Sequence, residues 1–163
     1  MTDLKIASKV LVLCTILALM AVTVSAVSAK SVTVGNYIVS DKAPDIKASL
    51  NSPATVVSPL TTYYYIIQGQ SRYHTSNLPS GIHWLELDLN WGNSANSLDL
   101  TIYSPSGNNL GTYNDMSDGR RDGRIHLSVY PSGGYIDPGM WVNKVYGASV
   151  SGSQRYTFNV YGH

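Results

Sequence analysis

Apolar and polar residues alternate along most of the chain after residue 30, which is the pattern of β-strands that bury one face. The clearest run is residues 98–103, in which two Leu and one Ile alternate with Asp, Thr and Tyr. Ser-Pro-Ser-Gly follows at 104–107. It favours a turn, because proline has no amide hydrogen for a sheet and glycine tolerates a positive φ. We therefore predict a hairpin whose second strand covers residues 109–113.

The same reasoning predicts strands in most of the remaining chain. They are expected at residues 31–40, 61–67, 82–90, 125–130, 140–146 and 155–161, with a short one at 72–77. No stretch after residue 30 has a convincing helical period. Seven or eight short strands about ten residues apart predict an all-β fold, a single antiparallel two-sheet β-sandwich of jelly-roll-like form.

Residues 1–29 have the features of a signal peptide. Lys5 and Lys9 precede an apolar run, and Val27-Ser28-Ala29 has the small residues of a cleavage site, although cleavage after Ala26 fits almost as well. The uncharged run at 10–29 is also just long enough to span a bilayer, so an uncleaved membrane anchor is the alternative. We expect cleavage, and hence a secreted or cell-surface protein.

Three prolines in the next segment separate it from the main domain. We predict that residues 30–60 form an N-terminal strand and a Pro-containing linker, and that residues 61–163 form the sandwich.

Composition supports an extracellular protein and excludes two classes of function. Tyr contributes 12 residues, while charged residues make up only 13% of the 163. Removing residues 1–29 takes two Lys and one Asp from 11 basic and 10 acidic residues, which leaves nine of each and no basic surface for nucleic acid. The only cysteine, Cys14, lies in the leader. The mature chain therefore has no disulfide, zinc-thiolate site or cysteine nucleophile.

Catalytic patterns are missing from the sequence. The four histidines are far apart and have no metal-binding spacing. His126, Asp122 and one of many serines would make a triad only by chance, because no Gly-x-Ser-x-Gly segment supports it. We predict that the protein is not an enzyme, and keep a small secreted hydrolase as the least favoured alternative.

The most polar segment, residues 114–124, contains the candidate metal ligands Asp115, Asp118 and Asp122. Acids in a glycine-rich turn are typical of calcium sites, but this spacing is not that of an EF-hand. The segment also contains three arginines, which we expect to pair with the three carboxylates. We predict a solvated loop and no cofactor, with a calcium site as the alternative.

Aromatic side chains are the candidate ligand-binding residues. Trp84 and Tyr103 are predicted on the polar faces of their strands, and Trp91 in a loop. Rings left open on a sandwich can stack on sugars or anchor a protein interface. The alternative is that they cover sheet edges or stabilise cross-strand pairs.

The order of these features resembles the bacterial and archaeal pre-peptidase C-terminal domain (PPC domain). The resemblance covers about residues 61–162 and rests on a few segments in order: Trp84-Leu85-Glu86-Leu87-Asp88-Leu89, L-D-L-T-I-Y-S-P-S-G at 98–107, P-G-M-W at 138–141, V-Y-G at 145–147 and Y-T-F-N-V at 156–160.

The resemblance implies a secreted, jelly-roll-like β-sandwich without catalytic activity, of a kind found beside secreted peptidases. Members bind a protein or a polysaccharide, and some bind calcium, although this chain has no residue-by-residue match to their calcium ligands. Our leading hypothesis is a non-catalytic secreted or cell-surface module that binds an extracellular protein or polysaccharide, or assembles. A carbohydrate-binding module using surface Trp and Tyr is the alternative. We expect contact with a membrane only if the leader stays uncleaved.

Overall fold

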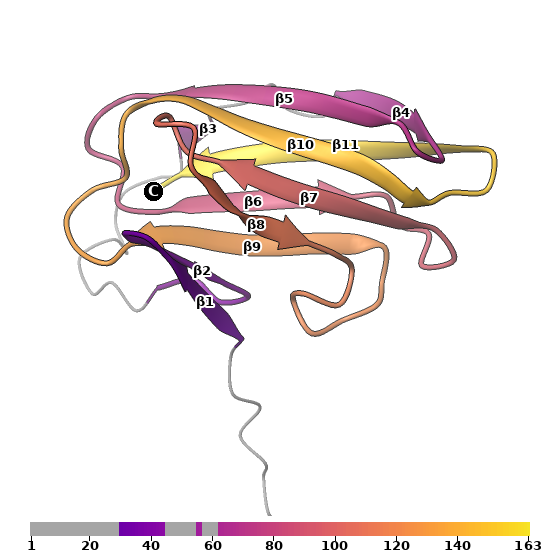
Figure 1. The fold of residues 1–163 in the computed structure, drawn as a ribbon, viewed down its shortest axis with the longest axis horizontal. Helices are drawn as coiled ribbons and strands as arrows, with labels where there is room; N and C mark the ends of the chain where they lie inside the picture. Colours follow the sequence, from indigo (N-terminus) through magenta and orange to yellow (C-terminus); the bar gives the residue numbers. More distant parts are fainter. Residues whose placement is uncertain (1–29, 45–54, 57–61) are drawn as a thin grey trace, which may run out of the picture.

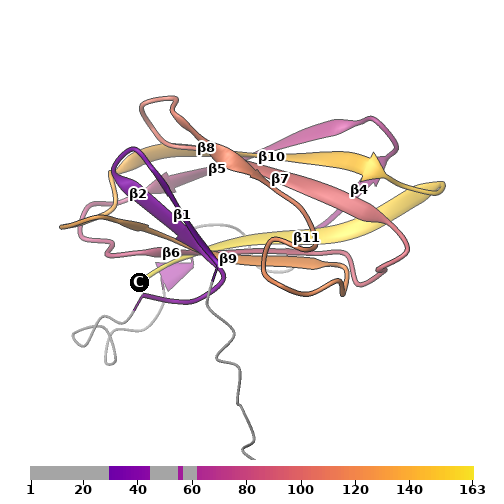
Figure 2. The same cartoon turned by 60° about the horizontal axis from the view of Figure 1, so that its bottom comes forward.

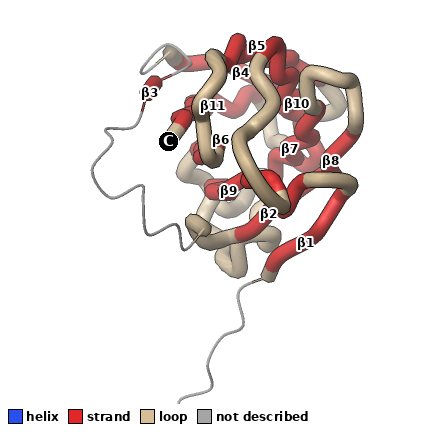
Figure 3. The backbone as a smooth tube through the Cα atoms, turned by 90° about the vertical axis from the view of Figure 1, so that its left-hand side faces the viewer, coloured by secondary structure: helices blue, strands red, loops and turns tan. Residues whose placement is uncertain are grey.

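The computed structural model describes residues 30–44, 55–56 and 62–163, and all regular structure among them is β-strand (Figure 1; Figure 3). The predicted signal peptide and most of the predicted linker lie outside these residues. The described part of the chain has no helix of the length and apolarity that crossing a bilayer requires. The strands are β1 (Ser31–Val34), β2 (Tyr37–Ser40), β3 (Thr55–Val56), β4 (Tyr63–Ile67), β5 (Ser71–Leu78), β6 (Leu85–Asn90), β7 (Ser97–Tyr103), β8 (Asn109–Tyr113), β9 (Arg124–Pro131), β10 (Gly139–Ser149) and β11 (Ser153–Gly162).

Two antiparallel sheets form the fold, as predicted. The larger, seven-stranded sheet has the order β1-β2-β9-β6-β11, and the far edge of β11 is shared by β4 and β3. The smaller sheet has the order β5-β10-β7-β8. Figure 2 shows the sheets as two layers, with β5, β10, β7 and β8 above β6, β9 and β11. The expected two-sheet sandwich is therefore confirmed.

The segment 31–40 corrects a prediction. It is a hairpin and not one strand, because Gly35 and Asn36 form a two-residue turn between the paired residues Val34 and Tyr37. Gly35 has a φ of 59°, which suits glycine at such a turn. The hairpin also belongs to the sandwich, since β2 pairs with β9 and extends the larger sheet.

The hairpin predicted from residues 98–113 is confirmed. β7 and β8 pair, and the turn between them is closed by a hydrogen bond from the Gly107 N–H to the Ser104 carbonyl of 2.9 Å. Its apolar residues Leu98, Leu100 and Ile102 are fully buried. They meet the alternating buried residues of the opposite sheet: Leu85, Leu87 and Leu89 on β6, Ile125, Leu127 and Val129 on β9, and Tyr156, Phe158 and Val160 on β11. One contiguous core thus lies between the sheets.

One side of the sandwich is formed by β4 and β5, which follow one another in sequence but belong to different sheets. The turn Gln68-Gly69-Gln70 carries the chain from one sheet to the other. It is held to β10 by hydrogen bonds of 2.9 Å from the Gly69 N–H to the Gly147 carbonyl and from the Gly147 N–H to the Gln70 carbonyl. Both strands lie at the edges of their sheets. A depression in the surface opens between these two edges.

Candidate functional site

Trp91, a predicted ligand-binding residue, is buried. Its side chain is 6% exposed, and its indole N–H donates to the carbonyls of Asn93 and Asn96 at 3.0 and 3.1 Å. Gln154 completes the arrangement by donating to the Trp91 carbonyl at 3.0 Å. The residue therefore holds the β6–β7 loop against the core, and little of its ring is exposed, so the structure does not support an open stacking role for Trp91.

Trp84 lies just before β6 and is half-buried. Its ring stacks on the imidazole of His163, with 3.8 Å between the ring centroids and 6° between the planes. Glu86 holds this histidine, through Oε2 and Nε2 at 3.2 Å, and also contacts His126 Nε2 through Oε1 at 2.8 Å. One face of the Trp84 ring is thus covered by His163, and a ligand-binding role for the other face stays a prediction.

The acidic segment 114–124 is organised by hydrogen bonds from the backbone to its carboxylates. Asp115 Oδ1 accepts from the backbone N–H groups of Asp122, Gly123 and Arg124 at 3.0–3.2 Å. Asp118 accepts from the backbone N–H of Arg120 and of His126, both at 3.1 Å. Burial raises the pKa of Asp118, although these two backbone hydrogen bonds act in the opposite direction.

The expected pairing of three arginines with these acids is not found. Arg124 instead pairs with Asp88 on β6, with 2.7 Å between Nε and Oδ1, and none of the ion pairs of the described residues joins Arg120 or Arg121 to Asp115, Asp118 or Asp122. In the described part of the chain, no group of three or more His, Cys, Asp or Glu side chains is arranged so that it could hold a metal ion. The alternative of calcium binding stays untested.

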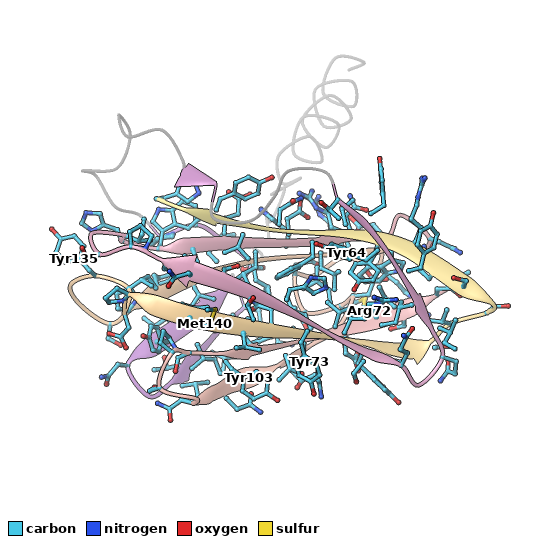
Figure 4. The ribbon with its side chains drawn as sticks, turned by 90° about the horizontal axis from the view of Figure 1, so that it is seen from above. Tyr64, Arg72, Tyr73, Tyr103, Tyr135 and Met140 are labelled. Carbon is cyan, nitrogen blue, oxygen red and sulfur yellow. The ribbon has the colours of Figure 1, made fainter. Side chains whose placement is uncertain are left out.

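Tyr103 lies on the outer face of the smaller sheet, as predicted. It forms, with Tyr73, Met140 and Val142, a patch that we call the tyrosine face; these residues and Pro105 line a shallow groove of about 460 Å³. Tyr73 is 65% exposed and Met140 52%. Val142 is the register partner of Tyr103, which places the central part of the patch on neighbouring strands. Figure 4 shows Tyr73, Tyr103 and Met140 on the same side of the molecule, away from Tyr64.

A second depression opens between β4 and β5. We call it the edge pocket; it has a volume of about 480 Å³ and is lined by Tyr64, Arg72, Tyr73, His74, Thr75, Ser76 and Phe158. Figure 4 looks onto this open side and shows Tyr64 and Arg72 between the ribbons of the two sheets. Sequence reasoning identified none of these residues as a site.

His74 is surrounded by aromatic rings in the edge pocket. The Tyr64 ring meets it edge-on at 4.5 Å between centroids, the Phe158 ring lies at 5.1 Å, and the Tyr156 hydroxyl is 2.9 Å from His74 Nε2. Burial, together with the smaller effect of the nearby charge of Arg72, lowers the pKa of His74 to about 4. The imidazole is therefore neutral at neutral pH.

Two buried polar side chains near His74 have no hydrogen-bond partner among the described residues. They are Ser76, which is 2% exposed and unpartnered at Oγ, and Asn143, which is 1% exposed and unpartnered at both Oδ1 and Nδ2. Asn143 on β10 is the register partner of His74 on β5, and Ser76 is the partner of Trp141. Both unpartnered groups thus lie beside His74, on the buried face of the sheet.

Arg72 supplies the positive charge of the pocket. Its Nε donates to the Tyr65 carbonyl at 2.6 Å, which fixes the side chain. No carboxylate pairs with this guanidinium in the described residues. The pocket therefore combines aromatic walls and one unpaired cation, with buried hydrogen-bonding groups that lack partners beside it.

One sequence signal could have located the edge pocket. Asn143 alternates with Trp141 and Val145 and so occupies an inward position, where a polar residue is unusual. This same residue makes the buried face of segment 140–146 ambiguous in the sequence. The pairing that brings His74 beside Asn143 joins segments far apart in the chain, and alternation alone does not predict it.

Comparison with known proteins does not assign a family. No family model matches the chain, so the resemblance to the PPC domain stays a prediction. A stretch of 43 residues is 49% identical to an uncharacterized protein of Archaeoglobus fulgidus. This match covers 26% of the present chain and 59% of the archaeal protein, which is less than two thirds of its length.

Two solved structures show distant similarity. The CspB protease of Clostridium perfringens matches with a TM-score of 0.46 and 14% identity, over 60% of this chain and 24% of the protease. An arabinose-bound α-L-arabinofuranosidase, MgGH51, matches with a TM-score of 0.30 and 14% identity, over 83% of this chain and 23% of the enzyme. Similarity at this level does not extend to an activity or a ligand.

Proposed function

We propose that this protein is a non-catalytic module that acts outside the cell or at its surface and binds another protein through the tyrosine face. The observation that supports this proposal most directly is the exposure of Tyr73 and Met140 beside Tyr103 on the outer face of the smaller sheet. Tyrosine and methionine are enriched at protein interfaces, because they combine a large contact area with some polar or adaptable character.

The surroundings of the patch fit the same role. Thr75 and Asn77 on β5 are the uncharged register partners of Val142 and Met140, Lys144 is the register partner of Tyr73 at the border of the patch, and Asp99 lies further along the sheet. An apolar centre with a polar rim is the usual composition of a protein interface.

The extracellular location rests on the sequence of residues 1–29, and the lack of catalysis rests on the absence of catalytic patterns and on the resemblance to the PPC domain. Fractionation of the native host, with mass spectrometry of the N-terminus, tests the location. We expect a mature chain that begins at Lys30 or Val27. Recovery of the complete chain from the membrane would instead support an uncleaved anchor.

Site-specific photocrosslinking on intact cells tests the binding face. Benzoylphenylalanine at position 103 should give a discrete protein adduct, whereas the same probe at position 135 should not. Tyr135 is a matched control because it is also exposed but lies at another end of the molecule (Figure 4). The double variant Tyr103→Ser/Met140→Ser should reduce retention of the partner identified in this way. Equal labelling at both positions would contradict the proposal.

A polysaccharide is the second candidate partner, because neighbouring tyrosine rings can also stack on sugars. Sedimentation with insoluble polysaccharides separates the two candidates. Binding to a polysaccharide that is lost in the double variant, without any protein adduct at position 103, would favour this second function.

A further inference from the structure

We propose that the edge pocket is a second binding site, independent of the tyrosine face, whose ligand is a hydroxylated ring carrying one carboxylate, as in a uronic acid. The site is built from Arg72 and Ser76, which line the pocket together with the aromatic walls around His74, and the unpartnered Asn143 amide lies behind this lining as the register partner of His74. Each of these groups selects one part of the ligand.

The carboxylate is selected by Arg72. Its guanidinium lines the pocket, is held on the Tyr65 carbonyl through Nε, and has no carboxylate partner in the described residues. Arg72 is exposed, and a planar guanidinium binds a carboxylate through two parallel hydrogen bonds. His74 adds no second positive charge, because its pKa is lowered to about 4.

The hydroxyl groups are selected by the unpartnered buried atoms. Asn143 Nδ2 needs an acceptor, Asn143 Oδ1 needs a donor, and Ser76 Oγ can serve as either. An inorganic anion or a simple carboxylate offers only acceptors, so it would leave Oδ1 without a partner. A ring hydroxyl offers both functions, to Ser76 in the lining and, through a bridging water, to Asn143 behind it beside His74.

The ring itself is selected by the walls. Tyr64 and Phe158 line the pocket from the larger sheet, and Tyr73 lines it from the smaller one. Aromatic side chains bury the C–H surfaces of a sugar ring while its hydroxyls reach polar groups at the edges. A volume of about 480 Å³ lies within the range typical of small-molecule sites.

Titration calorimetry on the mature protein, with sodium glucuronate and sodium galacturonate as probes, tests this site. We expect saturable binding of at least one uronate at millimolar concentration. Neutral glucose or galactose, which lack the carboxylate, and acetate, which lacks the ring, should bind more weakly by on the order of 10- to 100-fold. Failure of both uronates to bind, or equal binding of glucose, would overturn the proposal.

Two variants separate a binding role from a structural one. Arg72→Gln should weaken uronate binding by at least about tenfold and leave glucose binding unchanged. Asn143→Leu should abolish uronate binding and at the same time raise the melting temperature of the free protein, because it replaces unpartnered polar atoms by an apolar group of similar size. A lower melting temperature for Asn143→Leu would show that the amide serves the fold and would contradict the proposal.

The control is Tyr103→Ser/Met140→Ser, which alters the tyrosine face and should bind uronates as the wild type does. Tyr73 stays unchanged in this variant because it lines both sites. Normal uronate binding with loss of the protein partner would confirm that the two sites are separate. Loss of uronate binding in this control would refute their independence.

Discussion

His74 and Asn143 are paired across β5 and β10, and the Asn143 amide is fully buried with neither of its polar atoms bonded within the described residues. An unpartnered buried polar group lowers stability by about 1–3 kcal/mol. His74 has its own partner in the Tyr156 hydroxyl and stays neutral. The unliganded protein thus carries a polar cluster that is only partly satisfied, beside the pocket between β4 and β5.

The first prediction concerns the pH dependence of stability. His74 has a pKa lowered from its usual 6.5 to about 4, so in this interval the unfolded chain binds a proton that the folded protein does not. Stability from this group is therefore complete above about pH 6.5 and is lost as the pH falls toward 4. Chemical denaturation at several pH values should show a smaller loss for His74→Gln than for the wild type.

The comparison with the variant is needed because other groups act in the opposite direction. Asp99 and Asp118 have raised pKa values, mainly through burial, and so favour the folded state as the pH falls. Identical pH profiles for wild type and His74→Gln would show that the histidine is not kept neutral by the pocket.

The second prediction concerns the hairpin of β7 and β8. Leu100 is fully buried between the sheets, so Leu100→Ala should lower the free energy of unfolding by about 2–5 kcal/mol. Asp99 points to the opposite face and is only half-buried, so Asp99→Ala should have a far smaller effect. Urea denaturation of both variants measures the difference, and equal losses would contradict the assignment of faces.

The third prediction concerns the close approach of the β4–β5 turn to β10. A Cβ added to Gly147 would lie 2.3 Å from the Ile67 carbonyl oxygen, and this backbone atom cannot move aside without disturbing the turn. Gly147→Ala should therefore destabilise the protein by about 1–3 kcal/mol. Gly133→Ala is the control, since nothing lies within 4 Å of its added Cβ. A melting temperature unchanged in both variants would show that the turn adapts freely.

The sequence predicted the architecture better than the site, for a physical reason. Alternation specifies which side chains of a strand share a face, and this placed Leu98, Leu100 and Ile102 in the core correctly. It does not specify which strands pair, so the meeting of His74 with Asn143 was not predicted.

Local chemistry misled the sequence reasoning at two further points. Trp91 follows a strand and so was expected in an exposed loop, but backbone carbonyls of that loop fold around its indole N–H and bury it. Gly35-Asn36 was included in one strand although it is a recognised hairpin turn. The turn chemistry was visible in the sequence, whereas the burial of Trp91 depends on the closed loop.

The last prediction concerns the role of Asp115. Its Oδ1 accepts three backbone N–H groups of the 114–124 segment, so Asp115→Ala should lower stability by about 1–3 kcal/mol. The matched control is Asp122→Ala, because this carboxylate is exposed and should contribute little. Thermal unfolding with and without millimolar calcium should give the same melting temperature for the wild type.

This expectation has a clear physical alternative, because Asp115 Oδ2 is buried and has no partner among the described residues. A calcium ion bound there would stabilise the folded state by about 2.7 kcal/mol at a hundredfold excess over its Kd. It would need six to eight oxygen ligands, while Asp118 already receives two backbone hydrogen bonds, and no group of three acidic or histidine side chains among the described residues is arranged so that it could hold a metal ion. A calcium-dependent rise in melting temperature that is absent in Asp115→Asn would show that the segment binds the metal after all.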